Sequence, residues 1–269
     1  MSFVSPWIDE AVIVFFVLSG FVIAHATQDP RTTPTSYAVA RLSRIYSVAL
    51  PAIAVTIVMD ALGRIIDPAH YLNDPGYHPE HLVLQFTLAA FFLSQLWYLD
   101  MPVGSMGPYW SLCFEVWYYV AFGLLHFLPS PRRWIASGLL ALFVGPGIVA
   151  YGLFWAMGVV AYRVTQRPMA VLPGAMLCLG GAGLMAAAIS LGVPGEEAVQ
   201  RLTAPVLGNA NYWHDGGVAI GFALHLIGFS AIAHVVAPAL AAIETPLRWL
   251  AGATFSIYLY HLPVAHGVR

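Results

Sequence analysis

The sequence is poor in charged residues. Only 9% of its 269 residues are Asp, Glu, Lys or Arg, and the 11 basic residues are all Arg. An ordinary soluble domain has about 25% charged residues. The net charge of -2 and the lack of any run of like charges also exclude the basic surface of a nucleic-acid-binding protein. The chain is therefore predicted to be a membrane protein with no nucleic-acid partner.

Cysteine is equally scarce. Cys113 and Cys178 are the two cysteines, and both lie in apolar runs, where they are expected to be small buried hydrophobes and not a disulfide. The metal-binding spacing of the HExxH kind is absent, and His225 and His234 are nine residues apart and so do not share a helix face. The sequence predicts no metal site and no bound cofactor.

Long apolar runs fill most of the chain, which is 59% hydrophobic with a mean hydropathy of +0.76. Runs of roughly 17 to 25 residues suit membrane-spanning helices. We expect an all-α fold, a polytopic helical bundle of about eight or nine transmembrane helices in one domain over residues 1–269. The expected spans include 11–26, 82–99, 109–127, 171–193, 217–236 and 247–264. The run 134–164 is interrupted at Gly145, which leaves two short helices or one kinked span open.

Arginine placement predicts the topology. Arg31, Arg41 and Arg44 precede the second apolar run, which places this loop in the cytoplasm by the positive-inside rule, whereas residues 67–81 have three acids, three His and no Arg. We predict a multi-pass protein of the cell inner membrane. Under this assignment Arg132 and Arg133 fall on the opposite side.

Glu115 is the carboxylate inside the apolar run 109–127. An ionised side chain near mid-span costs roughly 2.5 to 3.5 kcal/mol, so Glu115 is expected to face protein or water and to meet an Arg or His partner. Ser111 lies one turn earlier on the same face. The neighbouring aromatic residues could line a cavity for a polar substrate or form an interfacial belt; they are Trp110, Trp117, Tyr118 and Tyr119.

Arg41 and Arg44 are one helical turn apart, at the start of a long apolar run. They could anchor the helix by snorkelling to lipid phosphates. Alternatively they form a clamp for a soluble phosphorylated donor such as coenzyme A, because a guanidinium group binds phosphate oxygens bidentately.

Two histidines are candidates for a general base, because imidazole titrates near neutrality. His261 lies in the last apolar run with Tyr258 one turn earlier, and His25 ends the first apolar run. Each could equally be a hydrogen-bonded packing residue.

Four stretches in order carry a resemblance to the acyltransferase-3 family. They are VFFVLSGFVI from residue 14, RLSRIY from residue 41, YWSLCFEVWYY from residue 109 and FSIYLYHLPV from residue 255. Proteins of this family are membrane enzymes that O-acylate, most often O-acetylate, sugars of polysaccharides and glycolipids, with acyl-CoA as the donor. The family usually has a further helix with the favoured catalytic His before the FFVLSGF helix, and at least one further span after the FSIYLYH helix.

The resemblance implies roles for individual residues. Arg41 and Arg44 would hold the donor phosphates, Ser111 and Glu115 would belong to the catalytic or acceptor cavity, and Tyr258 and His261 would contribute to the pocket from the last helix. The expected partners are acyl-CoA as co-substrate, a carbohydrate or glycolipid acceptor, and membrane lipids.

Membrane-bound O-acyl transfer to a carbohydrate hydroxyl is thus the leading hypothesis. A proton-coupled transporter or flippase, in which Glu115 and the histidines relay protons, is a second hypothesis. The third is an inactive remnant of an acyltransferase, in which the base is absent.

Overall fold

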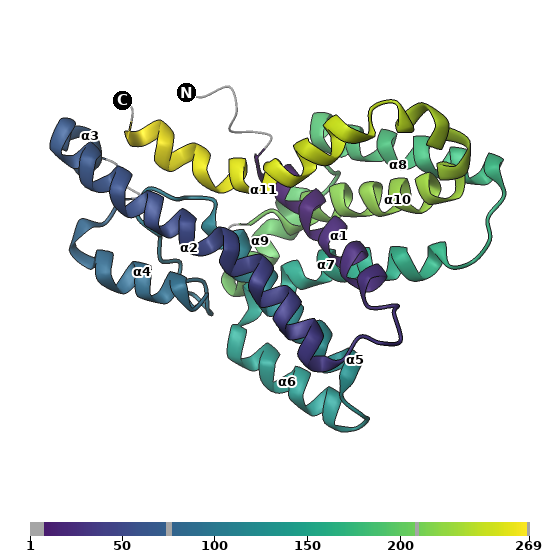
Figure 1. The fold of residues 1–269 in the computed structure, drawn as a ribbon, viewed down its shortest axis with the longest axis horizontal. Helices are drawn as coiled ribbons and strands as arrows, with labels where there is room; N and C mark the ends of the chain where they lie inside the picture. Colours follow the sequence, from purple (N-terminus) through teal and green to yellow (C-terminus); the bar gives the residue numbers. More distant parts are fainter. Residues whose placement is uncertain (1–7, 74–76, 208–209, 268–269) are drawn as a thin grey trace. The chain divides into compact units, whose positions relative to one another are not determined.

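The computed structural model describes residues 8–73, 77–207 and 210–267. Within these ranges every regular element is a helix and no strand occurs, which confirms the all-α prediction (Figure 1). The helices are α1 (Ile8–Ala26), α2 (Pro34–Ile66), α3 (Pro68–Asn73), the short 3-10 helix η2 (Pro79–His81), α4 (Leu82–Ala90), α5 (Tyr109–Phe127), α6 (Arg132–Val144), α7 (Pro146–Thr165), α8 (Val171–Leu191), α9 (Glu196–Leu207), α10 (Tyr212–Ala241) and α11 (Glu244–Gly267).

Helix length and composition support a membrane protein. In the described part of the chain, four helices are long and apolar enough to cross a bilayer, namely α2, α7, α8 and α10, and α1 contains a shorter apolar stretch. The 33 residues of α2 make it about 50 Å long, which exceeds the roughly 30 Å hydrocarbon core. At least one end of α2 therefore projects beyond the hydrocarbon.

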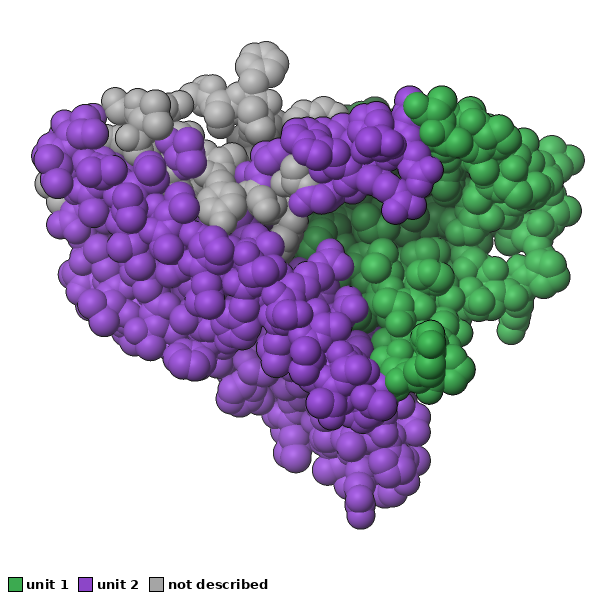
Figure 2. Space-filling model, in the orientation of Figure 1, with its two compact units in different colours: residues 1–32, 149–242 green, residues 33–148, 243–269 purple. Residues whose placement is uncertain are grey.

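The chain forms two compact units (Figure 2). Unit 1 comprises residues 1–32 and 149–242, and unit 2 comprises residues 33–148 and 243–269. Each unit thus combines segments that are far apart in the sequence.

Glycines let the helices of unit 1 pack closely. The α8 and α10 helices lie side by side (Figure 1), and a Cβ on Gly181 would lie 2.4 Å from the backbone nitrogen of His225. Between α1 and α7, a Cβ on Gly158 would lie 1.8 Å from the carbonyl oxygen of Val17. Small residues at helix contacts of this kind are typical of packing in lipid.

The long α2 helix is the centre of unit 2, and α3, α4, α5 and α11 all contact it. The α6 helix packs on α5. Residues 91–108, between α4 and α5, are irregular and hydrogen-bond to this framework: the indole nitrogen of Trp117 donates to the Phe92 carbonyl at 3.0 Å, and the Trp97 amide donates to the Val144 carbonyl at 2.9 Å.

The expected span 82–99 is wrong. The α4 helix has nine residues, about 13 Å, and ends at Ala90, where irregular chain with positive φ at Phe92 and Trp97 begins. Hydropathy could not reveal this, because seven of the nine residues 91–99 are apolar or aromatic although the helix has ended.

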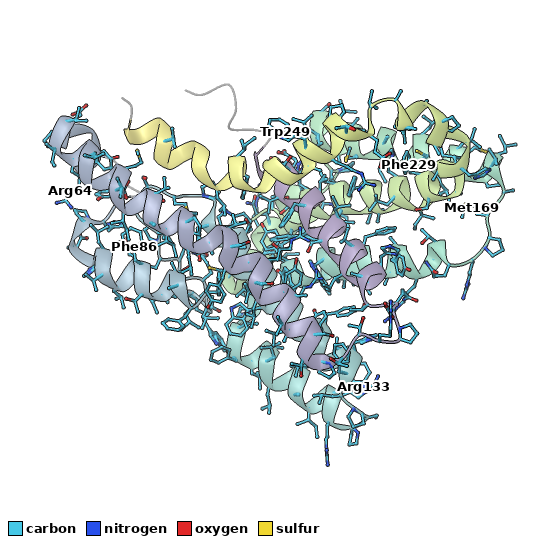
Figure 3. The ribbon with its side chains drawn as sticks, viewed as in Figure 1. Arg64, Phe86, Arg133, Met169, Phe229 and Trp249 are labelled. Atoms are coloured by element: carbon cyan, nitrogen blue, oxygen red, sulfur yellow. The ribbon has the colours of Figure 1, made fainter. Side chains whose placement is uncertain are left out.

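The next long helix, α5, returns alongside α2 in the opposite direction. Tyr37 near the start of α2 meets Phe127 at the end of α5, with 5.4 Å between ring centroids. Arg132 and Arg133 follow α5 directly, so they lie at the same end of this helix pair as Arg41 (Figure 3 labels Arg133). This placement corrects the prediction that put the two groups of arginines on opposite sides.

The apolar run 134–164 is two helices, α6 and α7. They are separated at Gly145, where a φ of +90° favours glycine. A Cβ added at this position would lie 2.6 Å from the Cα of Trp97. The structure therefore selects one of the two alternatives that the sequence left open.

Candidate functional site

Glu115 lies on α5 with its side chain inside unit 2, where it is only 2% exposed. The hydroxyl of Tyr119 donates a hydrogen bond to its Oε1 atom. Residues at positions i and i+4 share a helix face, so this hydrogen-bond donor to the carboxylate comes from its own helix. The expectation that Glu115 faces protein is met, and its catalytic role stays a prediction.

Arg41 approaches the same tyrosine from α2. Its guanidinium carbon is 5.9 Å from the ring centroid of Tyr119 and 6.0 Å from that of Tyr37. The rings provide cation–π contacts, worth about 0.5 to 2 kcal/mol each depending on desolvation. Tyr119 therefore contacts both the Arg41 guanidinium, through its ring, and the Glu115 carboxylate, through its hydroxyl.

The Nε atom of Arg41 is buried, and no described protein atom accepts a hydrogen bond from it. A buried donor without an acceptor costs free energy, so such a group in a folded protein requires an explanation. A ligand oxygen at this position would satisfy it.

A groove between α2 and α5 surrounds Arg41. It has a volume of about 390 Å³ and is mostly apolar, and Arg41 is the one charged residue among the described residues that line it. Its lining runs from Pro34 to Ile45 on α2, and from Val116 on α5 to Leu128 just after this helix. Ligand pockets usually measure roughly 300 to 1,000 Å³, so the groove has the size of a binding site.

Tyr37 fixes the two walls of this groove. Its hydroxyl donates to the carbonyl oxygen of Tyr119 at 2.9 Å. Gly123 gives its ring room, because a Cβ there would lie 3.3 Å from the ring. The rings that contact Arg41 are thus held by a bond between the two helices.

Arg44 is exposed and does not line the groove. The three-residue spacing turns its side chain about 60° around the helix from Arg41. The structure therefore does not bring the two arginines together into one clamp, and the donor-binding role of Arg44 stays a prediction.

Ser111 and Tyr258 do come together. Their hydroxyl oxygens are 3.2 Å apart, and both hydroxyls donate to the Pro108 carbonyl, at 3.0 and 3.4 Å. Ser111, Glu115 and Tyr119 are spaced four residues apart, so they form a polar stripe about 12 Å long on one face of α5.

Trp110 and Tyr118 are placed differently. Trp110 is half-buried in the first turn of α5, edge-on to Phe114 at 5.2 Å between centroids. Tyr118 is buried and donates to the Ile148 carbonyl at 3.0 Å, which gives its hydroxyl a structural role.

The roles of the two histidines as bases stay predictions. His25 belongs to unit 1, where its side chain is exposed and its Nδ1 lies 3.3 Å from the hydroxyl of Tyr162. His261 is on α11, but its side chain lies outside the described residues.

Sequence reasoning missed a second buried carboxylate, Asp60 of α2, which is 2% exposed. It accepts hydrogen bonds from the amide, at 3.0 Å, and the hydroxyl of Ser105. The signal was available, since Asp60 interrupts an apolar run just as Glu115 does.

Unit 1 contains another group that sequence reasoning missed. His214 of α10 lies between two carboxylates, with Nε2 3.5 Å from Glu10 of α1 and Nδ1 3.7 Å from Glu196 of α9. These residues are far apart in the sequence, and no motif connects them. In the described ranges no group of three or more His, Cys, Asp or Glu side chains could hold a metal ion.

Unit 2 thus contains a buried carboxylate on α5, an arginine in an apolar groove between α2 and α5, and a pair of hydroxyls from α5 and α11. A sequence profile of the acyltransferase-3 family, described as an acyltransferase domain, matches residues 4–269. The chain belongs to this family.

A curated relative is also similar to part of the chain. It is "Protein 2 in picA locus" of Rhizobium radiobacter, 35% identical over 118 residues, which cover 39% of this chain and 60% of the relative. The match thus spans less than two thirds of the relative's length. No solved structure matches the chain.

Proposed function

We propose that the protein is a membrane-bound O-acyltransferase that transfers an acyl group, most simply acetyl, from acyl-CoA to a hydroxyl of a carbohydrate or glycoconjugate. The observation that carries this proposal is the contact of Tyr119 with both Arg41 and Glu115. It connects a cationic group in a ligand-sized groove to a buried carboxylate on the same helix face.

The groove suits the donor. Acyl-CoA combines phosphates with an apolar thioester arm, and the groove combines one guanidinium with apolar walls. The Nε of Arg41 would donate to a donor oxygen, which supplies the missing acceptor. Arg41, Arg44, Arg132 and Arg133 gather at this end of the helix pair, which supports a cytoplasmic donor site in a multi-pass inner-membrane protein.

In the reaction, the acceptor oxygen attacks the thioester carbonyl carbon, the carbon–sulfur bond breaks, and coenzyme A leaves as the thiol. The proton of the acceptor hydroxyl passes to a base and then to the departing sulfur. Glu115 is the base candidate connected to the groove, and Tyr119 would hold its carboxylate in place.

The test uses the full chain in lipid nanodiscs with acetyl-CoA and a panel of methyl glycosides. Thiol release and acetylated product are measured for the unaltered protein, for Glu115→Gln and for Glu197→Gln, whose exposed side chain pairs with Arg201. Glu115→Gln keeps the side-chain shape but removes the base, so turnover should fall by at least about 100-fold. Glu197→Gln should match the unaltered protein.

Unchanged turnover in Glu115→Gln would remove this residue from the mechanism. Absence of thiol release in the unaltered protein, together with proton-coupled solute uptake into vesicles, would instead favour the transporter hypothesis.

A further inference from the structure

A second cavity of unit 2 lies at the N-terminal end of α5. The groove around Arg41 reaches the opposite end of this helix, at Leu124, Phe127 and Leu128. The volume of the second cavity is about 280 Å³. It is lined by residues from the first turn of α5, from the irregular segment 91–108 and from the position just before η2. The ones that matter here are His78, Gln95, Asp100, Met106, Tyr109 and Trp110. Of these only Trp110 belongs to the predicted acceptor cavity.

The wall of this cavity is held rigidly, although it is not regular structure. Gln85 of α4 accepts from the Gly104 amide at 3.1 Å and donates to the His78 carbonyl at 2.9 Å. Asp60 holds the next residue, Ser105. Gly104 has a φ of +55°, and a Cβ there would lie 2.3 Å from the Asp60 carboxylate. A site built this way loses little entropy when it binds a ligand.

The polar groups of the cavity point to hydroxyl recognition. The amide nitrogen of Gln95 donates to Oδ1 of Asp100 at 3.1 Å. Gln95 is half-buried and Asp100 is exposed, and this bond leaves the second carboxylate oxygen, the second amide N–H and the amide oxygen available to a ligand. Two neighbouring hydroxyls of a ring could donate to the carboxylate and accept from the amide together.

The apolar part completes a platform. Met106 and Tyr109 are buried beneath the cavity, at 1% and 0% exposure, and Trp110 is half-buried beside them. The face of an indole carries negative charge density, so it attracts the partly positive C–H groups on the face of a sugar ring.

The lining disfavours a phosphate and an acyl chain as ligands. No Arg occurs among the described residues that form it, and the Asp100 carboxylate would repel a phosphate. The carboxylate and the amide make binding of an acyl chain unfavourable, because these polar groups would lose their hydrogen bonds to water. A volume of about 280 Å³ is at the lower limit for ligand pockets and admits one ring-sized ligand.

We propose that this cavity binds a single neutral sugar ring, with Trp110 as the stacking platform and the Gln95–Asp100 pair as the hydroxyl-binding group. That the bound ring is the acyl acceptor rests on the proposed function, whereas the binding itself does not.

Saturation-transfer NMR on the full chain in nanodiscs tests the binding, with the methyl glycosides of glucose, galactose and N-acetylglucosamine as probes. At least one should bind with a Kd of the order of 1 mM. Asp100→Asn should weaken it about fivefold or more, since an acceptor for a hydroxyl loses its charge. Glu244→Gln, an exposed carboxylate of the same unit paired with Arg248, should leave it unchanged.

Trp110→Ala should weaken binding about tenfold, and Trp110→Phe should restore part of it because a ring face remains. If Trp110→Ala does not fold, the Asp100→Asn result decides by itself.

Binding of no glycoside, or equal binding in Asp100→Asn, would overturn the proposal. Choline is tested in the same way. If it binds more tightly than every glycoside, and if this binding is lost in Asp100→Asn, the proposal is overturned in favour of an ammonium-binding site. Acetyl-CoA binding is measured on the same samples. Glycoside binding without acetyl-CoA binding would contradict the proposed function and leave this site standing.

Discussion

The phenol hydroxyl of Tyr119 donates a hydrogen bond to the carboxylate of Glu115, one turn earlier on α5. The ring of the same tyrosine contacts the guanidinium group of Arg41 on α2. One side chain thus connects the proposed base to the proposed donor site. The hydroxyl and the ring of Tyr119 should therefore have separable functions.

Tyr119→Phe removes the hydroxyl and keeps the ring. A hydrogen bond to a charged group contributes about 1.5 to 3 kcal/mol, so we expect acetyl transfer to fall by about 10- to 100-fold. Acetyl-CoA affinity should stay within about twofold, since the cation–π contact remains. Turnover and binding are both measured on the protein in nanodiscs.

Tyr37→Phe is the matched comparison for that experiment. It also removes one buried phenol hydroxyl, but this one donates to the backbone of Tyr119. We expect lower thermal stability with a smaller loss of turnover than in Tyr119→Phe. Equal losses of turnover in both variants would indicate that the Tyr119–Glu115 bond only supports packing.

Asp60 should control the ionisation of Tyr71, which follows α2 on α3. Burial, the negative charge of Asp60 and the neighbouring Tyr77 together raise the pKa of Tyr71 from about 10 to about 12, and burial is the largest of these causes. A raised pKa in the folded state means that the neutral phenol stabilises the fold below about pH 10, and that this contribution is lost as the pH rises towards 12.

Asp60→Asn removes this charge, so the pKa of Tyr71 should fall towards its ordinary value. The change is measured by ultraviolet titration of phenolate absorbance. The signal of Tyr71 is obtained by subtracting the titration of the matching Tyr71→Phe variant from that of each protein. A Tyr71 pKa that is the same in the unaltered protein and in Asp60→Asn would show that burial alone sets it.

Gly158 should tolerate no larger residue. A Cβ added at this position would lie 1.8 Å from the Val17 carbonyl oxygen and 2.7 Å from the Phe21 amide nitrogen, both of α1. Gly158→Ala should therefore lower stability by about 3 kcal/mol or more, because backbone atoms must move apart. Gly183→Ala in α8 meets nothing within 4 Å and should be neutral or stabilising by up to about 1 kcal/mol.

Thermal unfolding in detergent compares these two variants. Similar midpoints for Gly158→Ala and Gly183→Ala would contradict the close α1–α7 packing in unit 1.

The sequence predicted the parts of the site that lie on one helix. Ser111 and Glu115 share a face of α5, because a spacing of four residues has that consequence in any helix. The distant neighbours were not predictable in this way. The contact of Arg41 with Tyr119 depends on how α2 and α5 pair, and their antiparallel pairing depends on the non-spanning α4 between them.

The positions of residues outside the long apolar runs were the hardest to predict from the sequence. Gln95 and Asp100 lie in an irregular segment that was expected to be partly helical, and the amphipathic α9 with Glu196 was not expected at all. Hydropathy detects burial in lipid, but the hydrogen bonds that hold such segments come from side chains of other elements, such as Asp60 and Gln85.

The affinity of the protein for acetyl-CoA in the Arg41→Gln variant tests the central claim most directly. Arg201→Gln, which removes an exposed arginine of the other unit, serves as the control, and Arg44→Gln tests the second predicted donor residue. The account predicts that Arg41→Gln weakens binding by about 10- to 100-fold, because a charge-assisted bond in an apolar groove is lost. An affinity within twofold of the unaltered protein would contradict the assignment of this groove to the acyl donor.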